Sequence, residues 1–146
     1  MAKIFVTRLI PESGLSLLRK EGHEVDVSEK DGVLTKSELI EHLSMKPYDA
    51  ILSLLTDKID SDIFNAVFSA KIFANYAVGV DNVDLKTAKE RGISVTNTPG
   101  VLTNTVAEHA FALVLACAHR IAEADAFTRA GKYTGWAPKL LLGTDI

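Results

Sequence analysis

Apolar and polar positions alternate along the first hundred residues in a way that separates strands from helices. Runs rich in β-branched and aromatic residues, with a period of two or no polar break, predict strands. Five such runs are bounded by glycine, proline or charged residues. The predicted strands are K-I-F-V-T (3–7), H-E-V-D-V-S (23–28), D-A-I-L-S-L-L (49–55), K-I-F-A-N-Y-A-V (71–78) and I-S-V-T-N-T (93–98).

Each predicted strand is followed by a segment with helical spacing and recognisable ends. Thr35 with Glu38 three residues later forms a capping box that predicts a helix start. Asp60 is a second capping residue, and Gly22 and Gly92 stand where helices end. The predicted helices span residues 13–22, 35–43, 60–68 and 84–92, and one long helix from 103 to 131, a stretch without proline and without glycine before residue 131.

Strand and helix alternating in this way predict an α/β fold. A flavodoxin-like, five-stranded parallel sheet of order 2-1-3-4-5, with helices on both faces and a long C-terminal helix, suits the pattern best. We expect a domain over residues 1–102, completed by the long helix of residues 103–131. Residues 132–146 hold glycines and a proline and are expected to be a linker.

Composition narrows the functional classes. The 146 residues are 47% hydrophobic and 24% charged with a net charge of -3, so no nucleic-acid or anionic membrane partner is expected. A single cysteine excludes an internal disulfide and thiolate zinc sites, and no metal site is expected. The amino terminus lacks a signal-peptide pattern, and the longest apolar run, residues 110–118, is too short to cross a bilayer. We expect a soluble cytoplasmic protein.

The carboxyl ends of the predicted strands are where ligands bind in such folds. There, Gly79 would allow a positive φ and a close ligand approach. The N–H groups of Val78, Gly79 and Val80 could then form a small anion site for a carboxylate. The alternative is a plain strand-to-helix turn. The G-x-G-x-x-G spacing of a dinucleotide-binding turn does not occur in these residues.

The segment of residues 105–122 is apolar nearly all round, so another domain or subunit is expected to cover it. Within it, His109 is expected to be packed and hydrogen-bonded rather than catalytic, and Cys117 to be a small buried hydrophobe. Trp136 is either an anchor at an interface or a lid over the core of its own domain.

Four motifs together resemble the D-isomer-specific 2-hydroxyacid dehydrogenases, and within them the glyoxylate/hydroxypyruvate reductase branch. They are N-Y-A-V-G-V-D-N-V-D, R-G-I-S-V-T-N-T-P-G-V-L-T, V-A-E-H-A-F-A-L-V-L-A and G-W-A-P-K-L-L-L-G-T-D-I. The resemblance implies that the N–H groups of Val78 and Gly79 hold the carboxylate of a small 2-oxo or 2-hydroxy acid, with Leu55 lining the pocket. It implies that Thr103 approaches the nicotinamide of NAD or NADP, and that Trp136 reaches the partner's active site in a homodimer.

The resemblance also implies a second domain that these residues do not contain. In the family, a Rossmann NAD(P) domain carrying the catalytic Arg, Glu and His follows L-G-T-D-I. We therefore expect the substrate-binding domain of a dehydrogenase, truncated before its cofactor domain, with no catalytic residue and no activity alone. The dimer could form by exchange of the long helix. The alternative is a stand-alone flavodoxin-like module that binds or associates without catalysis.

Overall fold

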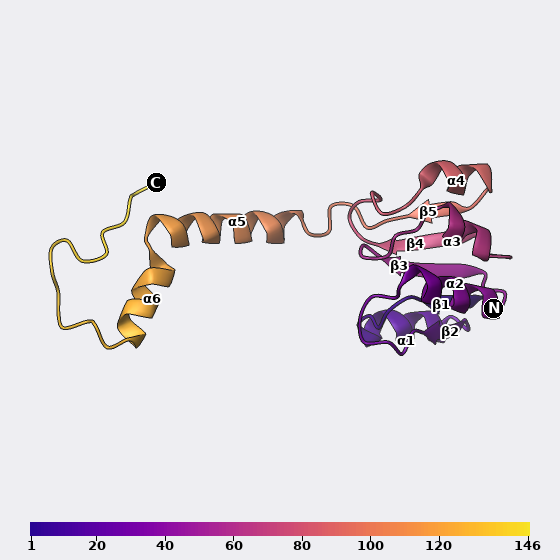
Figure 1. Cartoon of the computed structure of the whole chain (residues 1–146), viewed down its shortest axis with the longest axis horizontal. Helices are drawn as coiled ribbons and strands as arrows, with labels where there is room; N and C mark the ends of the chain where they lie inside the picture. The colour runs from indigo at the N-terminus through magenta and orange to yellow at the C-terminus, as the bar shows by residue number, and fades with distance from the viewer. The chain divides into compact units, whose positions relative to one another are not determined.

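The structure, a computed structural model, describes every residue from Met1 to Ile146. The chain divides into two compact units, Met1–Gly100 and Val101–Ile146, and each is described by itself. Figure 1 labels the elements in chain order. They are β1 (Lys3–Val6), α1 (Glu12–Lys20), β2 (Glu24–Val27), α2 (Lys36–Met45), β3 (Ala50–Leu54), α3 (Ser61–Ala66), β4 (Ile72–Tyr76), α4 (Leu85–Glu90), β5 (Ser94–Thr96), α5 (Thr103–Ala118) and α6 (Ile121–Arg129).

The first unit is built on one parallel sheet of five strands in the order β2-β1-β3-β4-β5. This confirms the predicted α/β class and the flavodoxin-like strand order. All five strands and the four helices of this unit correspond to predicted segments. Their ends differ from the predicted ends by at most two residues. Because the strands are parallel, all five carboxyl ends reach the same edge of the sheet, and the loops that leave them meet there.

Side chains alternate between the two faces of the sheet and build two separate cores. On one face, α2, α3 and α4 cover Phe5, Ile51 and Phe73, which are almost fully buried. On the other face, α1 packs Leu15 against Ile4 and Val6. The first core is larger and extends across the sheet, whereas the second is confined to β1, β2 and β3.

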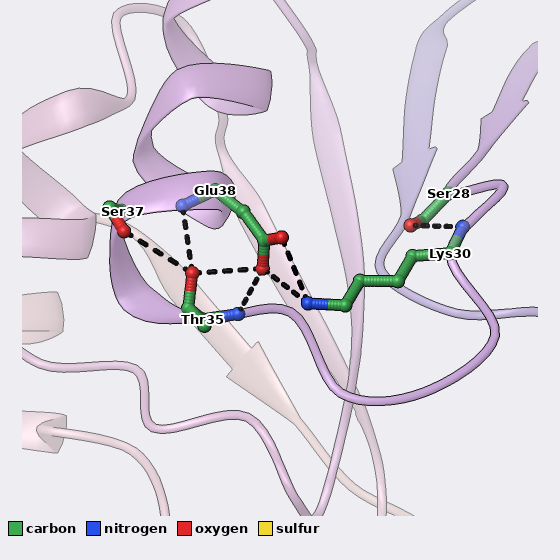
Figure 2. A network of polar contacts seen from close by, with 5 residues as sticks. All are labelled: Ser28, Lys30, Thr35, Ser37 and Glu38. Atoms are coloured by element: carbon green, nitrogen blue, oxygen red, sulfur yellow. Dashed lines mark hydrogen bonds and ion pairs between the residues drawn. The ribbon is translucent and has the colours of Figure 1, made fainter.

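The start of α2 shows how local sequence sets an element boundary. The Thr35 hydroxyl accepts a hydrogen bond from the Glu38 N–H at 3.3 Å, and the Glu38 carboxylate accepts one from the Thr35 N–H at 2.7 Å. This reciprocal pair confirms the predicted capping box. Figure 2 shows that Lys30, from the loop before the helix, reaches the same carboxylate.

The second unit differs from the prediction of one helix over residues 103–131. It contains two helices, α5 and α6, separated at Arg120, whose φ of 52° is left-handed. The Arg120 N–H bonds back to the Cys117 carbonyl at 3.2 Å, a closure typical of a helix end. The Arg120 guanidinium pairs with Glu123 in the first turn of α6. The prediction was wrong because a single non-glycine residue in the left-handed region can end a helix without proline or glycine.

Residues 132–146 form no helix or strand, as their glycines and proline predicted. Within this unit the end of the segment returns to the corner between α5 and α6. The Thr144 N–H donates to the Ala118 carbonyl at 2.8 Å. A Cβ on Gly143 would collide with that carbonyl and lie 2.8 Å from the His119 Cα, so only glycine allows this approach.

Candidate functional site

The candidate site lies at the carboxyl edge of the sheet, in the first unit. Leu54 pairs with Tyr76 at the ends of β3 and β4, so the loops that begin at residues 55 and 77 leave the sheet side by side. The structure therefore brings Leu55, Val78 and Gly79 to one edge. All three are exposed to solvent, as a binding surface requires.

The carbonyl groups of the loop after β4 are held by donors from other parts of the same unit. Three successive carbonyls each accept a hydrogen bond. Ala77 O accepts from Thr98 N at 2.9 Å and Thr98 Oγ1 at 3.1 Å, Val78 O from Asn97 Nδ2 at 2.7 Å, and Gly79 O from Asn75 Nδ2 at 3.1 Å. The backbone of this loop is thus fixed on its carbonyl side by the segment after β5 and by β4 itself.

The amide groups of the same loop have no partner. The N–H groups of Val78, Gly79 and Val80 donate to no acceptor in the structure. In a planar trans peptide the C=O and N–H bonds point in opposite directions, so anchoring each carbonyl directs the next residue's N–H away from the anchor. Successive N–H groups without an acceptor of their own are free to donate to an anion. The arrangement can hold a carboxylate.

Gly79 contributes to this site differently from the expectation. It was expected to take a positive φ, but the glycines with positive φ are elsewhere in the chain and Gly79 is not among them. The turn closes through hydrogen bonds from Ala77 N to Asn75 O at 2.8 Å and from Val83 N to Val80 O at 2.9 Å, which need no left-handed residue. What the glycine provides is the absence of a side chain beside its own N–H.

Behind the loop, the buried Asn75 side chain pairs with the half-buried side chain of Asn82. Asn75 Nδ2 donates to Asn82 Oδ1 at 2.9 Å, and Asn82 Nδ2 lies 3.2 Å from Asn75 Oδ1, which also accepts from Ser53 Oγ. The Asn82 amide further donates to the carbonyls of Leu54 and Asp57. This pair joins the loop after β4 to the loop after β3.

A second polar contact ties the loop after β3 to the end of β1. Asp57 and Thr7 are buried, and the Thr7 hydroxyl donates to Asp57 Oδ2 at 2.5 Å. The same oxygen accepts the Leu54 N–H at 2.8 Å. Three strand ends are thereby connected beneath the candidate site. Sequence reasoning missed these roles, although a buried asparagine or aspartate at a strand end is a signal because buried polar groups need partners.

Two carboxylates, Asp81 and Asp84, follow Gly79 within five residues. Hydrogen bonds from the Thr87 hydroxyl and then the Thr87 N–H hold the pKa of Asp84 below its usual range, so this carboxylate stays charged at the start of α4. Asp81 is exposed, and its Oδ2 lies 3.3 Å from where a Gly79 Cβ would be. A bound carboxylate would feel the charge of Asp81, so the N–H groups alone form a weak site.

The remaining predicted site residues belong to the second unit. Thr103 is the first residue of α5, and its side chain is exposed. Trp136 is 82% exposed, so it is not a lid over the core of its own unit. His109 and Cys117, expected to be buried, are exposed because nothing in the second unit covers α5, which has no buried residue.

Neither a cluster of metal-ligand side chains nor a helix able to span a membrane is found in the chain. No group of three or more histidine, cysteine or acidic side chains is placed to hold a metal ion. None of the helices combines the length and the apolar character that crossing a bilayer demands.

Comparison with known proteins decides the family. The model of the D-isomer specific 2-hydroxyacid dehydrogenase catalytic domain matches residues 4–134. The chain belongs to this family. A glyoxylate reductase of Korarchaeum cryptofilum (strain OPF8) is 49% identical to it over 145 residues. The crystal structure of the TT0316 protein from Thermus thermophilus superposes with a TM-score of 0.90 at 41% identity.

The matches cover nearly all of this chain but less than half the length of its relatives. The alignment takes in 99% of the chain and 43% of the Korarchaeum protein, and 98% of the chain and 45% of the Thermus protein. A D-lactate dehydrogenase from Aquifex aeolicus, solved in complex with NAD and lactic acid, shares the fold with a TM-score of 0.75 at 19% identity.

The glycine spacing of a dinucleotide-binding turn does not occur in this chain. A dinucleotide-binding turn needs three closely spaced glycines between a strand and a helix. Here the loop after β4 contains only Gly79, and the loop after β5 only Gly100. Gly22 and Gly92, which do have positive φ, follow helix ends instead.

Proposed function

We propose that this chain supplies the substrate-carboxylate half of the active site of an NAD(P)-dependent D-2-hydroxyacid dehydrogenase. The observation that carries the proposal is the row of unpaired N–H groups at Val78, Gly79 and Val80. Of these, Val78 and Gly79 bind the carboxylate of a small 2-oxo or 2-hydroxy acid, and the exposed Leu55 side chain lines the pocket. Glyoxylate and hydroxypyruvate are the candidate substrates, in keeping with the glyoxylate reductase relatives.

The role of these residues is to bind and orient. Two N–H donors on a fixed loop hold the carboxylate, which leaves the neighbouring 2-carbon free to face the rest of the site. The hydride itself is nicotinamide chemistry. Proton transfer to the substrate oxygen requires a general acid, and the resemblance to the family assigns that role to the NAD(P)-binding domain. We therefore expect the 146 residues alone to bind the acid without reducing it.

The second unit has separate proposed roles. We infer that residues 103–131 take part in dimerisation and that residues 132–146 link this domain to an NAD(P)-binding domain. In the assembled enzyme, Thr103 approaches the nicotinamide and Trp136 reaches the active site of the partner subunit. The exposed apolar side chains of α5 and the exposed Trp136 support these roles, because such surfaces are usually covered by another chain or domain.

A ligand titration followed by NMR tests the proposed function. Glycolate carries the carboxylate, and glycolamide is a neutral ligand of nearly the same shape. We expect glycolate to shift the backbone amide signals of Val78 and Gly79, glycolamide to leave them in place, and the chain to oxidise no NADH or NADPH with glyoxylate. Equal shifts with both ligands, or no shift at all, would refute the carboxylate site. Turnover above background would refute the expected inactivity.

A further inference from the structure

The peptide between Val78 and Gly79 is held in place by one side chain. The Asn97 amide donates to the Val78 carbonyl at 2.7 Å, and it makes no other hydrogen bond. Asn97 follows β5 and is exposed, whereas Val78 follows β4, so the contact crosses between two neighbouring loops. Because the peptide is planar and trans, this bond also sets the direction of the Gly79 N–H.

The neighbouring peptides are anchored more firmly. The Ala77 carbonyl accepts two hydrogen bonds, both from Thr98. The Gly79 carbonyl accepts from Asn75, which is 2% exposed and is itself held by the Asn82 side chain. The Val78–Gly79 peptide is therefore the part of this row whose orientation depends on a single solvent-exposed contact.

We propose that Asn97 is a positioning residue for carboxylate binding. By holding the Val78 carbonyl on the far side of the loop, it keeps the Gly79 N–H pointed at the ligand. If this peptide turned over, the negative end of the Val78 carbonyl would face the bound carboxylate in place of a donor. This inference rests on the proposed carboxylate site, and it adds a residue that touches neither substrate nor cofactor.

The expected size of the effect follows from the strength of one hydrogen bond. A neutral hydrogen bond at a solvated site stabilises its arrangement modestly, so Asn97→Ala should weaken glycolate binding by about 3- to 10-fold. Asn97→Gln keeps the amide donor on a longer side chain, and at an exposed position it should recover part of the affinity. The melting temperature of both variants should stay close to that of the unaltered chain, because the Asn97 side chain makes no other hydrogen bond.

The test compares glycolate affinity across matched variants of the whole 146-residue chain. The dissociation constant is measured from the Gly79 amide shift for the unaltered chain, Asn97→Ala, Asn97→Gln and the control Asn65→Ala. Asn65 is also exposed and also holds one partner, the Arg91 guanidinium, but it lies in α3, before β4, away from the carboxyl edge of the sheet. Asn97→Ala should also shift the Gly79 amide signal before ligand is added, and Asn65→Ala should not.

Each outcome has one meaning. Weakened binding in Asn97→Ala, partial recovery in Asn97→Gln and unchanged binding in Asn65→Ala support the positioning role. Unchanged binding in Asn97→Ala, or an equal loss in Asn65→Ala, overturns it and leaves the carboxylate site standing. If glycolate does not shift the Val78 and Gly79 amide signals of the unaltered chain, both the carboxylate site and the positioning role of Asn97 are refuted.

Discussion

Asn75 shows how a single residue can depart from the pattern of its element. In β4 it shares the buried face with Phe73, where alternation favours an apolar side chain, yet it is an amide with 2% exposure. Its cost of burial is offset because both its oxygen and its nitrogen have hydrogen-bond partners. One of these partners is the Gly79 carbonyl, so the departure from the pattern serves the loop that carries the site.

Glu38 is a residue whose charge state matters to stability. The Lys30 side chain foremost, then the Thr35 N–H and the Thr35 hydroxyl, lower the pKa of Glu38 from 4.5 to about 2. Figure 2 shows these groups around the carboxylate. Because the pKa is lower in the folded state, the charged carboxylate stabilises the fold above pH 4.5, and this contribution is lost as the pH falls toward 2.

We predict that Glu38→Gln lowers the melting temperature at pH 6 and that the difference from the unaltered chain closes as the pH falls to about 2. The measurement is thermal unfolding by circular dichroism over this pH range. Glu41→Gln is the control, since Glu41 is exposed on the same helix and makes no hydrogen bond. A difference that persists at the lowest pH would show that the lost contact is not the charged one.

At the scale of elements, the loops after β3 and β4 behave as one support. Ile59 and Val83 form a parallel bridge, and the Ile59 N–H donates to the Asn82 carbonyl at 2.8 Å. Asp57 extends this support to the end of β1 through the Thr7 hydroxyl. The loop that carries Gly79 is thus held from beneath by two other strand ends, which fits a preorganised binding site.

We predict that Asp57→Ala lowers the free energy of unfolding by about 2–4 kcal/mol, because it leaves the Thr7 hydroxyl and the Leu54 N–H without their acceptor. Thr7→Val removes the hydroxyl donor that Asp57→Ala leaves without an acceptor. The double variant Thr7→Val/Asp57→Ala should therefore lose less free energy of unfolding than the sum of the two single losses. Urea unfolding of the four proteins measures this coupling.

The control for that cycle pairs Thr7→Val with Asp49→Ala. The Asp49 carboxylate accepts the Lys3 N–H at 2.8 Å. Lys3 is the first residue of β1 and lies four residues before Thr7. The losses in the free energy of unfolding caused by Thr7→Val and Asp49→Ala should add in the double variant. Additive losses for Thr7 and Asp57 as well would show that the contact between them contributes nothing of its own.

At the scale of the whole molecule, the most informative feature is the apolar surface of the second unit. Phe111, Leu113, Val114 and Leu115 are all at least 44% exposed, and no residue of α5 is buried. Water contact over so many large apolar side chains on one helix is unfavourable. A second copy of the chain is the expected cover, which agrees with the dimer proposed above.

We predict that the chain is a dimer by light scattering at micromolar concentration and that Phe111→Glu shifts it toward the monomer. Leu17→Glu is the matched control, because Leu17 is a similarly exposed apolar residue at 61%, on α1 of the first unit. A monomeric mass for the unaltered chain, or an equal effect of both substitutions, would argue against association through α5.

Much of the fold was readable from local signals in the chain. The alternation of strand and helix, the capping box at Thr35 and the glycines after helices predicted the elements, because each depends on residues close in sequence. The sheet order was predictable because crossovers between parallel strands are right-handed, which leaves few possible orders. The place of Gly79 at the end of β4 was predictable for the same reason. The break at Arg120 was not, since a left-handed arginine leaves no mark in the sequence.

The direction of the N–H groups at Val78, Gly79 and Val80 was decided only by folding. These N–H groups stay without a partner because the carbonyls of the same loop are held by Asn75 on the strand and by Asn97 and Thr98, some twenty residues away. The pairing of β4 with β5 brings Asn97 and Thr98 within reach of the loop. Periodicity records which face a side chain takes, but not which distant donor meets a given carbonyl. The candidate residues of the site were therefore chosen from the sequence, whereas the direction of their N–H groups depends on the tertiary structure.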